Sequence, residues 1–309
     1  MSEKDSANPP QFPQEMVENF TSFLWDDPKS ISHCSLVSHR WYSAVRPFIY
    51  RRIVLESKER LTRFEHLLLG DPAIGYWVRE LHIVGGHRYY KTYSFWPEIF
   101  VSPGSGTFFP GRVLPEKLKK LYALTFECVY TSSVGASAHS IRAVSSAFAS
   151  TVRSLTFMSC LGHEGFFLAF AHAFPNLNEL RLMKVATKPL LHGTPLADDP
   201  DRSLAQFQEE VIPFMPLCLT QGNPTAEYDH PQTFITSLRI DHPDFVQDCE
   251  SLFCTKSLRT VQALEIRHSG SRLHPIDDIS NKILPECGRA LRSLKLTIAS
   301  LPEPEEIVR

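Results

Sequence analysis

The chain has 309 residues, of which 43% are hydrophobic and 21% charged, as in a soluble globular protein with a sizeable core. Its 32 Lys and Arg against 34 Asp and Glu give a formal net charge of -2, which argues against nucleic acid or an anionic membrane surface as the main partner. The longest nearly uncharged apolar stretch, 166–174, is much shorter than the about 20 residues of a membrane-spanning helix, so a transmembrane protein is excluded.

The first eleven residues are mostly polar and contain two prolines near their end, at positions 9 and 10. We therefore predict a disordered tail over 1–11 and no secretory signal. The chain has 7 cysteines at scattered positions, an odd number with no Cys-x-x-Cys pair. This usage predicts reduced thiols and a location in the cytosol or the nucleus.

Residues 12–50 show the pattern of three short helices. The first carries an apolar stripe at three- and four-residue spacing, formed by Phe12, Met16, Phe20, Phe23 and Leu24, with Val17 alongside. Asp27 and Pro28 are typical of the start of a second helix, and the segment around Trp41 predicts a third helix that ends near Pro47. A unit of this size has too small a core to be very stable on its own, so we expect it to pack against a neighbouring domain or a partner protein.

The next segment predicts one strand and one helix. Residues 50–55 are rich in β-branched residues, as in a short strand. An amphipathic helix follows over 61–68, and the sequence Gly-Asp-Pro at 70–72 marks its end.

A six-residue pattern, apolar-x-x-Leu-x-apolar, then recurs at 78–83, 121–126, 152–157, 177–182, 235–240, 261–266 and 291–296. The gaps between the central leucines are 43, 31, 25, 58, 26 and 30 residues, and several lie near the period of about 20–29 of leucine-rich repeats. Each hexad predicts a short strand, and only stacking the copies as a parallel sheet buries their apolar side chains. We expect an irregular solenoid over 51–309, with helices at 140–149, 164–174, 244–253 and 276–284 and insertions at about 85–117 and 187–233.

The N-terminal segment also carries a signature. It combines Pro-x-Glu at 13–15 with Met16 and Val17, the break at 27–28, and Val-x-x-Arg-Trp at 37–41. These residues resemble an F-box, and with the repeats behind them the layout is similar to F-box proteins with irregular leucine-rich repeats, of the kind expanded in mushroom-forming (basidiomycete) fungi. The expected fold class is α/β: a three-helix F-box over 12–50, then a leucine-rich-repeat solenoid with a parallel sheet on one face.

The resemblance implies a substrate-receptor subunit of an SCF-type cullin ubiquitin ligase. In that role the F-box docks on a Skp-family adaptor, which bridges to a cullin scaffold, and the repeats hold a protein substrate. The residues that match adaptor-contacting or core-packing positions of the F-box are Pro13, Met16, Val17, Leu24, Val37 and Trp41. For Met16 and Val17 we favour a place in the adaptor interface, because adjacent residues on a helix cannot both point into one small core. For Trp41, core packing and the adaptor interface are equally compatible with the sequence.

Side chains next to each central leucine are expected on the solvent face of the sheet. The candidate substrate-binding residues are His82, Thr125, Thr156, Arg181, Arg239, Glu265 and Lys295. Because their charges are of both signs, these residues do not indicate a particular ligand. The alternative to a substrate-binding surface is an ordinary solvent-exposed face of the sheet. The aromatic-rich stretch 89–96 is a second candidate surface, unless it caps an open edge of the solenoid.

No motif of a nucleophilic serine, a zinc site or a phosphate loop is present, so we expect no catalytic residue, cofactor or metal. The alternative function is a leucine-rich-repeat scaffold or protein-interaction module with no ubiquitin role, in which the helical unit caps the solenoid. The two hypotheses differ in whether the apolar face of 13–41 stays open to a partner.

Overall fold

The computed structural model describes residues 12–85, 114, 117–129, 148–163, 166–188, 234–241, 259–268 and 283–298. The chain divides into two compact units, Met1–Ile53 and Val54–Arg309, called here the N-terminal and the C-terminal unit. The expected tail, the expected helix 244–253, the aromatic-rich stretch 89–96, and most of the two insertions and of the expected helices 140–149 and 276–284 lie outside the described residues.

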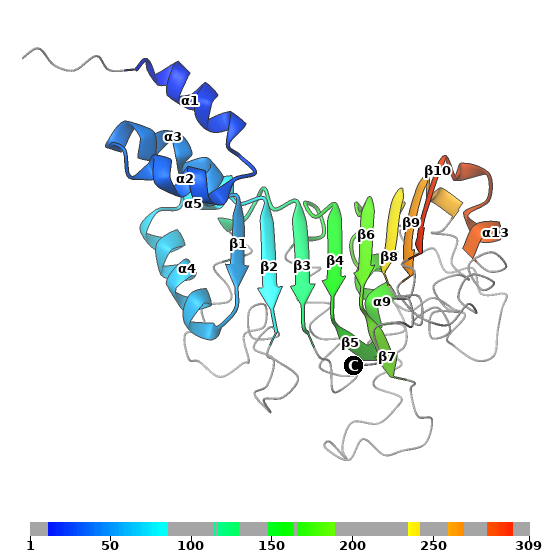
Figure 1. The fold of residues 1–309 in the computed structure, drawn as a ribbon. Helices are drawn as coiled ribbons and strands as arrows, with labels where there is room; N and C mark the ends of the chain where they lie inside the picture. The colour runs from blue at the N-terminus through cyan, green and yellow to red at the C-terminus, as the bar shows by residue number, and fades with distance from the viewer. Residues whose placement is uncertain are drawn as a thin grey trace, which may run out of the picture. The chain divides into compact units, whose positions relative to one another are not determined.

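The N-terminal unit contains α1 (Gln14–Phe23), α2 (Pro28–Ser35) and α3 (His39–Ile49), and α3 contacts both of the others (Figure 1). As predicted, Asp27 caps α2: its carboxylate accepts hydrogen bonds from the backbone N–H of Lys29 and Ser30. The hydroxyl of Ser30 also donates to it, and this bond is the main reason why the pKa of Asp27 lies below its usual value.

Helix α3 ends at Ile49, two residues after Pro47, so the predicted end near Pro47 is confirmed. A proline has no N–H and therefore removes one bond to the carbonyl four residues earlier. The amides that follow it still bond within the helix end, since Tyr50 N–H donates to the carbonyl of Arg46 at 3.1 Å and Arg51 N–H to that of Phe48 at 3.2 Å. The loss stays local because the helix ends two residues later.

The next elements are β1 (Arg52–Leu55), which contains the boundary between the units, α4 (Lys58–Gly70) and α5 (Ile74–Trp77). The remaining strands of the main sheet are β2 (Glu80–Val84), β3 (Ala123–Glu127), β4 (Ser154–Met158), β6 (Glu179–Met183), β8 (Ser237–Asp241), β9 (Ala263–His268) and β10 (Ser293–Ile298). Together with β1, these seven strands form an eight-stranded sheet in the order β1-β2-β3-β4-β6-β8-β9-β10 (Figure 1). A two-stranded sheet joins β5 (Leu161–His163) and β7 (Ala186–Lys188), and α13 (Leu284–Cys287) with the short 3-10 helix Gly288–Ala290 precedes β10.

Each of the seven hexads supplies one strand, and these strands are neighbours from β2 to β10. Every pairing among them is parallel, with no shift of register. Their central leucines therefore occupy one row: Leu81, Leu124, Leu155, Leu180, Leu238, Leu264 and Leu294. The predicted parallel sheet is confirmed.

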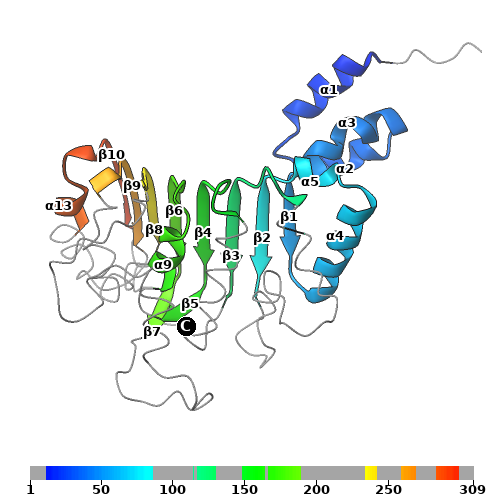
Figure 2. The ribbon, with the colours of Figure 1, turned by 180° about the vertical axis from the view of Figure 1, so that it is seen from behind.

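An aromatic cluster fills the core behind this row. Phe126 of β3 stacks on Phe157 of β4 with ring centroids 5.5 Å apart. Helix α9 (Phe166–His172), inside the range where a helix was predicted, lies on the side of the sheet that faces the viewer in Figure 2. It brings the ring of Phe167 to 4.9 Å from that of Phe157 and the ring of Phe170 to 5.1 Å from that of Phe126. Phe157 thus packs against rings from both its own sheet and α9.

Three successive strands end in the same corner. Cys128, Ser159 and Lys184 follow β3, β4 and β6 and have positive φ angles of 54°, 53° and 51°. The N–H of each donates to the carbonyl that ends the next strand, at 2.9, 2.8 and 3.2 Å respectively. Gly85 holds the same place after β2, where a Cβ atom would lie 2.4 Å from the carbonyl oxygen of Cys128, so only glycine fits there.

Helix α4 buries one carboxylate among apolar side chains. Glu65 is 2% exposed, like Leu61, Phe64 and Leu68 on the same face of the helix, and neither carboxylate oxygen has a hydrogen-bond partner in the described part of the chain. Burial raises the pKa of Glu65 to about 7. This side chain is therefore a neutral acid over part of the physiological range.

We predict that Phe157→Ala destabilises the protein by about 3–5 kcal/mol, because it removes a ring that touches three others and leaves a cavity. Urea unfolding followed by circular dichroism measures this change. Phe157→Leu, which retains most of the apolar volume, should cost clearly less, and equal costs for both variants would contradict the aromatic packing.

Glu65→Gln should raise stability at about pH 8 and flatten its pH dependence. The native pKa of about 7 lies above the ordinary 4.5, so the native state is favoured fully below pH 4.5 and loses this advantage as the pH rises through 7. The loss is on the order of 3 kcal/mol between the two limits. Urea midpoints at several pH values test this, with Glu59→Gln, an exposed carboxylate of the same helix, as the control. A wild-type pH slope in Glu65→Gln would refute the prediction.

Candidate protein-interaction sites

Helix α1 has one buried and one exposed side, and the predicted apolar stripe lies largely on the exposed one. Val17 and Thr21 are buried at 1% and 0% exposure, whereas Met16 is 55% and Phe23 82% exposed. The two neighbours Met16 and Val17 do point in different directions, but only Met16 is available to a partner. The prediction of Val17 as an interface residue is wrong, because its side chain belongs to the core of the unit.

The N-terminal unit leaves many large apolar side chains at its surface. They come from α1, from the residue before its N-cap and from the turns on either side of α2: Phe12, Met16, Phe20, Phe23, Trp25, Leu36 and Val37. Phe20, Phe23 and Leu36 were not among the predicted contact residues, although the helical spacing of the first two was visible in the sequence. A surface with this much exposed apolar area is typical of a protein-binding site.

The other predicted adaptor residues lie at the rim or in the interior of this surface. Pro13 precedes α1 and is exposed, as is Val37, and Leu24 is half-buried. Trp41 is also half-buried, and its ring meets that of Phe20 edge-to-face at 5.6 Å between centroids. Trp41 therefore takes part in packing and keeps some of its ring accessible.

Arg40 ties the start of α1 to α3, a role that the sequence pattern does not reveal. Its Nη1 donates to the carbonyl of Phe12 at 2.8 Å and its Nε to Oε1 of Gln14 at 3.0 Å. The basic residue of the motif is therefore engaged within the unit. It positions the first turn of α1, from which Met16 projects.

The C-terminal unit offers a second surface, the face of the main sheet opposite to the central leucines, called here the open face. Because side chains alternate along a strand and all strands are in register, the structure aligns the seven predicted substrate residues in one row from β2 to β10. The row runs through His82, Thr125, Thr156, Arg181, Arg239, Glu265 and Lys295.

Two members of the row are less accessible than predicted. His82 is 8% exposed and its Nε2 lies 2.8 Å from Oε2 of Glu127, and Thr156 is 9% exposed between its row neighbours Thr125 and Arg181. These two side chains are therefore largely buried and do not face solvent as expected, His82 beside the carboxylate of Glu127 and Thr156 among its neighbours in the row. The others in the row are half-exposed or exposed.

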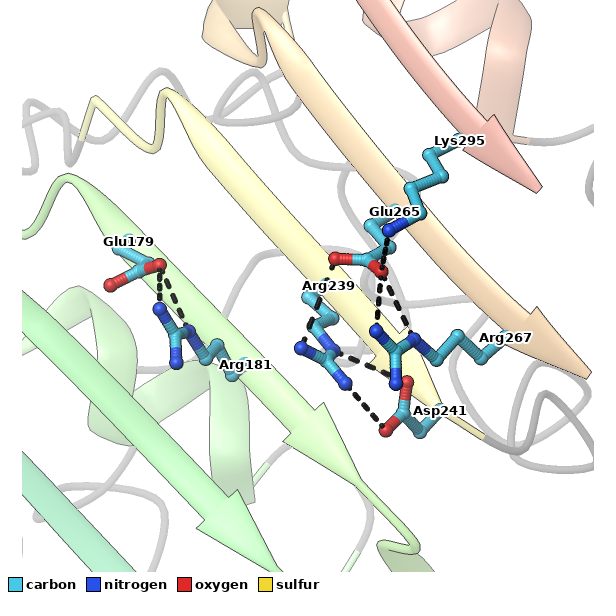
Figure 3. Close-up of polar contacts among 7 residues, drawn as sticks. All are labelled: Glu179, Arg181, Arg239, Asp241, Glu265, Arg267 and Lys295. Atoms are coloured by element: carbon cyan, nitrogen blue, oxygen red, sulfur yellow. Dashed lines mark hydrogen bonds and ion pairs between the residues drawn. The ribbon is translucent and has the colours of Figure 1, made fainter. Parts of the chain in front are cut away.

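Charged side chains cover the open face from β6 to β10 (Figure 3). On β6, Arg181 donates from Nε and Nη2 to Oε1 of Glu179, which also accepts a bond from Ser154 through its other oxygen. On β9 and β10, one oxygen of Glu265 lies 3.0 Å from Arg267 and 3.2 Å from Lys295. The other oxygen of Glu265 lies 3.8 Å from Nη1 of Arg239.

Two like charges are direct neighbours within this set. The register pairs Arg181 of β6 with Arg239 of β8, and each guanidinium turns to a carboxylate of its own strand, Glu179 and Asp241 respectively (Figure 3). Partial burial raises the pKa of Glu265, but the bonds from Lys295 and Arg267 and the charge of Arg239 outweigh this effect and hold its pKa below the usual value. The surface suits a polar partner with charges of both signs.

Three further findings concern other functions. Among the described residues, no three His, Cys, Asp or Glu side chains are grouped so that they could hold a metal ion. Cys160 is buried, its Sγ donates to the carbonyl of Phe126 at 3.3 Å, and burial raises its pKa to about 12. No helix in the described ranges has the length and hydrophobicity to cross a bilayer.

Comparison with known proteins concerns the N-terminal part of the chain. The family described as the COS11 F-box domain matches residues 10–85, from before α1 to the end of β2. The F-box protein COS111 of Candida glabrata is 31% identical over 71 residues, which are 23% of this chain and 8% of that protein. The matched region thus spans a small part of that relative. The chain carries an F-box domain at its N-terminus.

Glu265, the carboxylate at the centre of the charged set, is expected to stabilise the fold in a pH-dependent way. We predict that Glu265→Gln lowers stability near neutral pH by about 1 kcal/mol or less, as is usual for surface ion pairs. Since the pKa of Glu265 is depressed, its stabilising effect is present above 4.5 and is lost as the pH falls through the native pKa. Thermal unfolding at several pH values measures the difference from the wild type.

The matched control is Glu80→Gln. Glu80 is a half-buried carboxylate on the same face of β2, and it has no ion-pair partner in the described part of the chain. A constant difference between Glu265→Gln and the wild type at all pH values would show that the ion pairs do not stabilise the sheet.

Proposed function

We propose that the protein is a substrate-receptor subunit of an SCF-type cullin ubiquitin ligase with no catalytic role of its own. Its N-terminal unit binds a Skp-family adaptor, which connects it to a cullin scaffold, and its C-terminal unit binds the protein substrate. This function places the protein in the cytosol or the nucleus. The observation that carries the proposal is the F-box domain whose small helical unit leaves Met16, Phe23 and Val37 exposed.

Burial supports the adaptor role. The core of the N-terminal unit consists of small or medium side chains, namely Val17, Thr21, Ile31, Ala44 and Val45. Its largest apolar side chains remain at the surface. A helix or groove of a partner protein would cover them and remove their apolar area from water.

We interpret the C-terminal unit as an irregular leucine-rich-repeat solenoid. In support of this, seven hexads form adjacent strands in register, and three strands end in the same left-handed corner. A row of side chains that repeats once per strand gives a long binding surface, as in other repeat proteins. The substrate would contact the accessible part of the row, from Arg181 to Lys295.

The adaptor interaction is tested by capture of a purified Skp-family adaptor on the full-length chain. The double variant Met16→Glu and Val37→Asp places charges at two exposed apolar positions of the N-terminal unit. We expect at least about tenfold weaker binding, since buried charges at an interface lack partners. Circular dichroism verifies that the variant folds.

Leu69→Asp provides the matched control, because Leu69 is 50% exposed on α4 in the C-terminal unit. This variant should bind the adaptor like the wild type. Absence of adaptor binding by the wild type, or equal binding by the double variant, would overturn the proposed function and favour a scaffold without a ubiquitin role.

A further inference from the structure

Basic and aromatic side chains gather where β2, β3 and β4 begin. This group, called here the rim patch, consists of Tyr76, Arg79, Lys119, Lys120, Tyr122 and Arg153. Three of its members, Arg79, Tyr122 and Arg153, immediately precede the three strands. The parallel register therefore places them side by side along one edge of the sheet.

Hydrogen bonds hold the members of the rim patch together. Tyr122 N–H donates to the carbonyl of Arg79 at 2.7 Å, and Arg153 N–H donates to that of Tyr122 at 2.8 Å. Nη1 of Arg79 reaches the carbonyl of Lys120 at 3.3 Å, and Nζ of Lys120 lies 5.8 Å from the ring centroid of Tyr76. The turn before β3 and helix α5 thus contribute to the same surface as the strand ends.

The four cations of the rim patch are not neutralised within the described residues. The side chains of Arg79 and Arg153 donate to backbone carbonyls, those of Lys119 and Lys120 are exposed, and no carboxylate lies within ion-pair distance of any of them in this part of the chain. On the open face, in contrast, Arg181 and Arg239 each have a carboxylate partner. The rim patch is a local excess of positive charge on a chain whose net charge is -2.

The rim patch also contains two exposed tyrosines, which distinguish it from an ordinary solvated group of basic side chains. Tyr76 is 50% and Tyr122 51% exposed, so each leaves half of a large aromatic side chain open to a partner. Tyrosine and arginine are the residue types most enriched among energetically important positions of protein interfaces. Arginine also pairs with carboxylates through two parallel hydrogen bonds.

We propose that the rim patch binds an acidic segment of a partner protein, rich in Asp and Glu. Neighbouring strands are about 4.8 Å apart, so three strand ends span about 10 Å, the length of about three residues of extended chain. An acidic segment of this length can present a carboxylate to each of the two arginines at the strand ends. This inference rests on the proposed function in one respect: the partner that carries the acidic segment is the substrate for ubiquitin transfer.

The extent of the charge favours a protein segment over a nucleic acid. At the same position before β6, β8 and β9 the chain has Asn178, Thr236 and Gln262, none of which is charged. The continuous positive edge therefore stops after β4, although Arg292 holds the same position before β10. A duplex presents one phosphate charge about every 1.7 Å and is normally bound by a longer row of cations.

The test measures binding of a fluorescein-labelled peptide of alternating Glu and Ser, about twelve residues long, to the full-length chain by fluorescence anisotropy. Reversal of two exposed charges in Lys119→Glu with Lys120→Glu should weaken binding at least about tenfold and reduce its salt dependence. Arg289→Glu with Arg292→Glu is the matched control, because both residues are exposed near the start of β10 and the change in net charge is the same. This control should stay within about twofold of the wild type.

The proposal would be overturned by no binding of the peptide to the wild type, by equal loss in both double variants or by no loss in the rim variant. Tighter binding of a DNA oligonucleotide of the same charge than of the peptide would also overturn it. Adaptor capture, measured on the same preparations, separates this inference from the proposed function. A wild type that captures the adaptor without binding the peptide refutes the rim patch alone. A wild type that binds the peptide without capturing the adaptor refutes the proposed function and leaves the acidic-segment site standing.

Discussion

The C-terminal unit depends on one repeated contact, the packing of a buried leucine and a second apolar side chain against the same pair in the next strand. Leu124, Leu155 and Leu180 are fully buried, and the rings of Phe126 and Phe157 stack beside them. A single strand has no means of burying both residues, whereas stacked parallel strands do. Six of the seven strands bury both; on the last one, β10, Leu294 is 43% and Leu296 50% exposed. A slip by one residue would turn the whole row to solvent, which is why the register is constant from β2 to β10.

The same register arranges every other feature of the unit. It aligns the side chains of the open face in rows, so that Arg181 and Arg239 become neighbours and Glu265 comes within reach of three cations. It also brings the residues before the strands to one edge, where the rim patch lies. Chemistry at both surfaces is therefore a consequence of core packing, since the residues involved are distant in the sequence.

The N-terminal unit works by a different balance. Its three helices bury few and mostly small side chains, and its large apolar residues are at the surface. Capping by Asp27 and Ser38 and the clamp from Arg40 to the start of α1 hold the helices in place without a large core. Such a unit keeps its most hydrophobic residues available to a partner, in keeping with an F-box.

Local patterns in the sequence determined the elements: the hexads predicted the strands, Asp27 and Pro28 the start of α2, and the residues at 13–17 and 37–41 the F-box. The period of a pattern shows which residues share a face, but not which face is covered. The exposed side of α1 and the burial of His82 and Thr156 therefore came only from the tertiary structure. Ion pairing likewise depends on which strands become neighbours. The sequence by itself specified strands and helices because these follow from residues a few positions apart, whereas the aligned charges and the rim patch required the stacking of segments 25 or more residues apart.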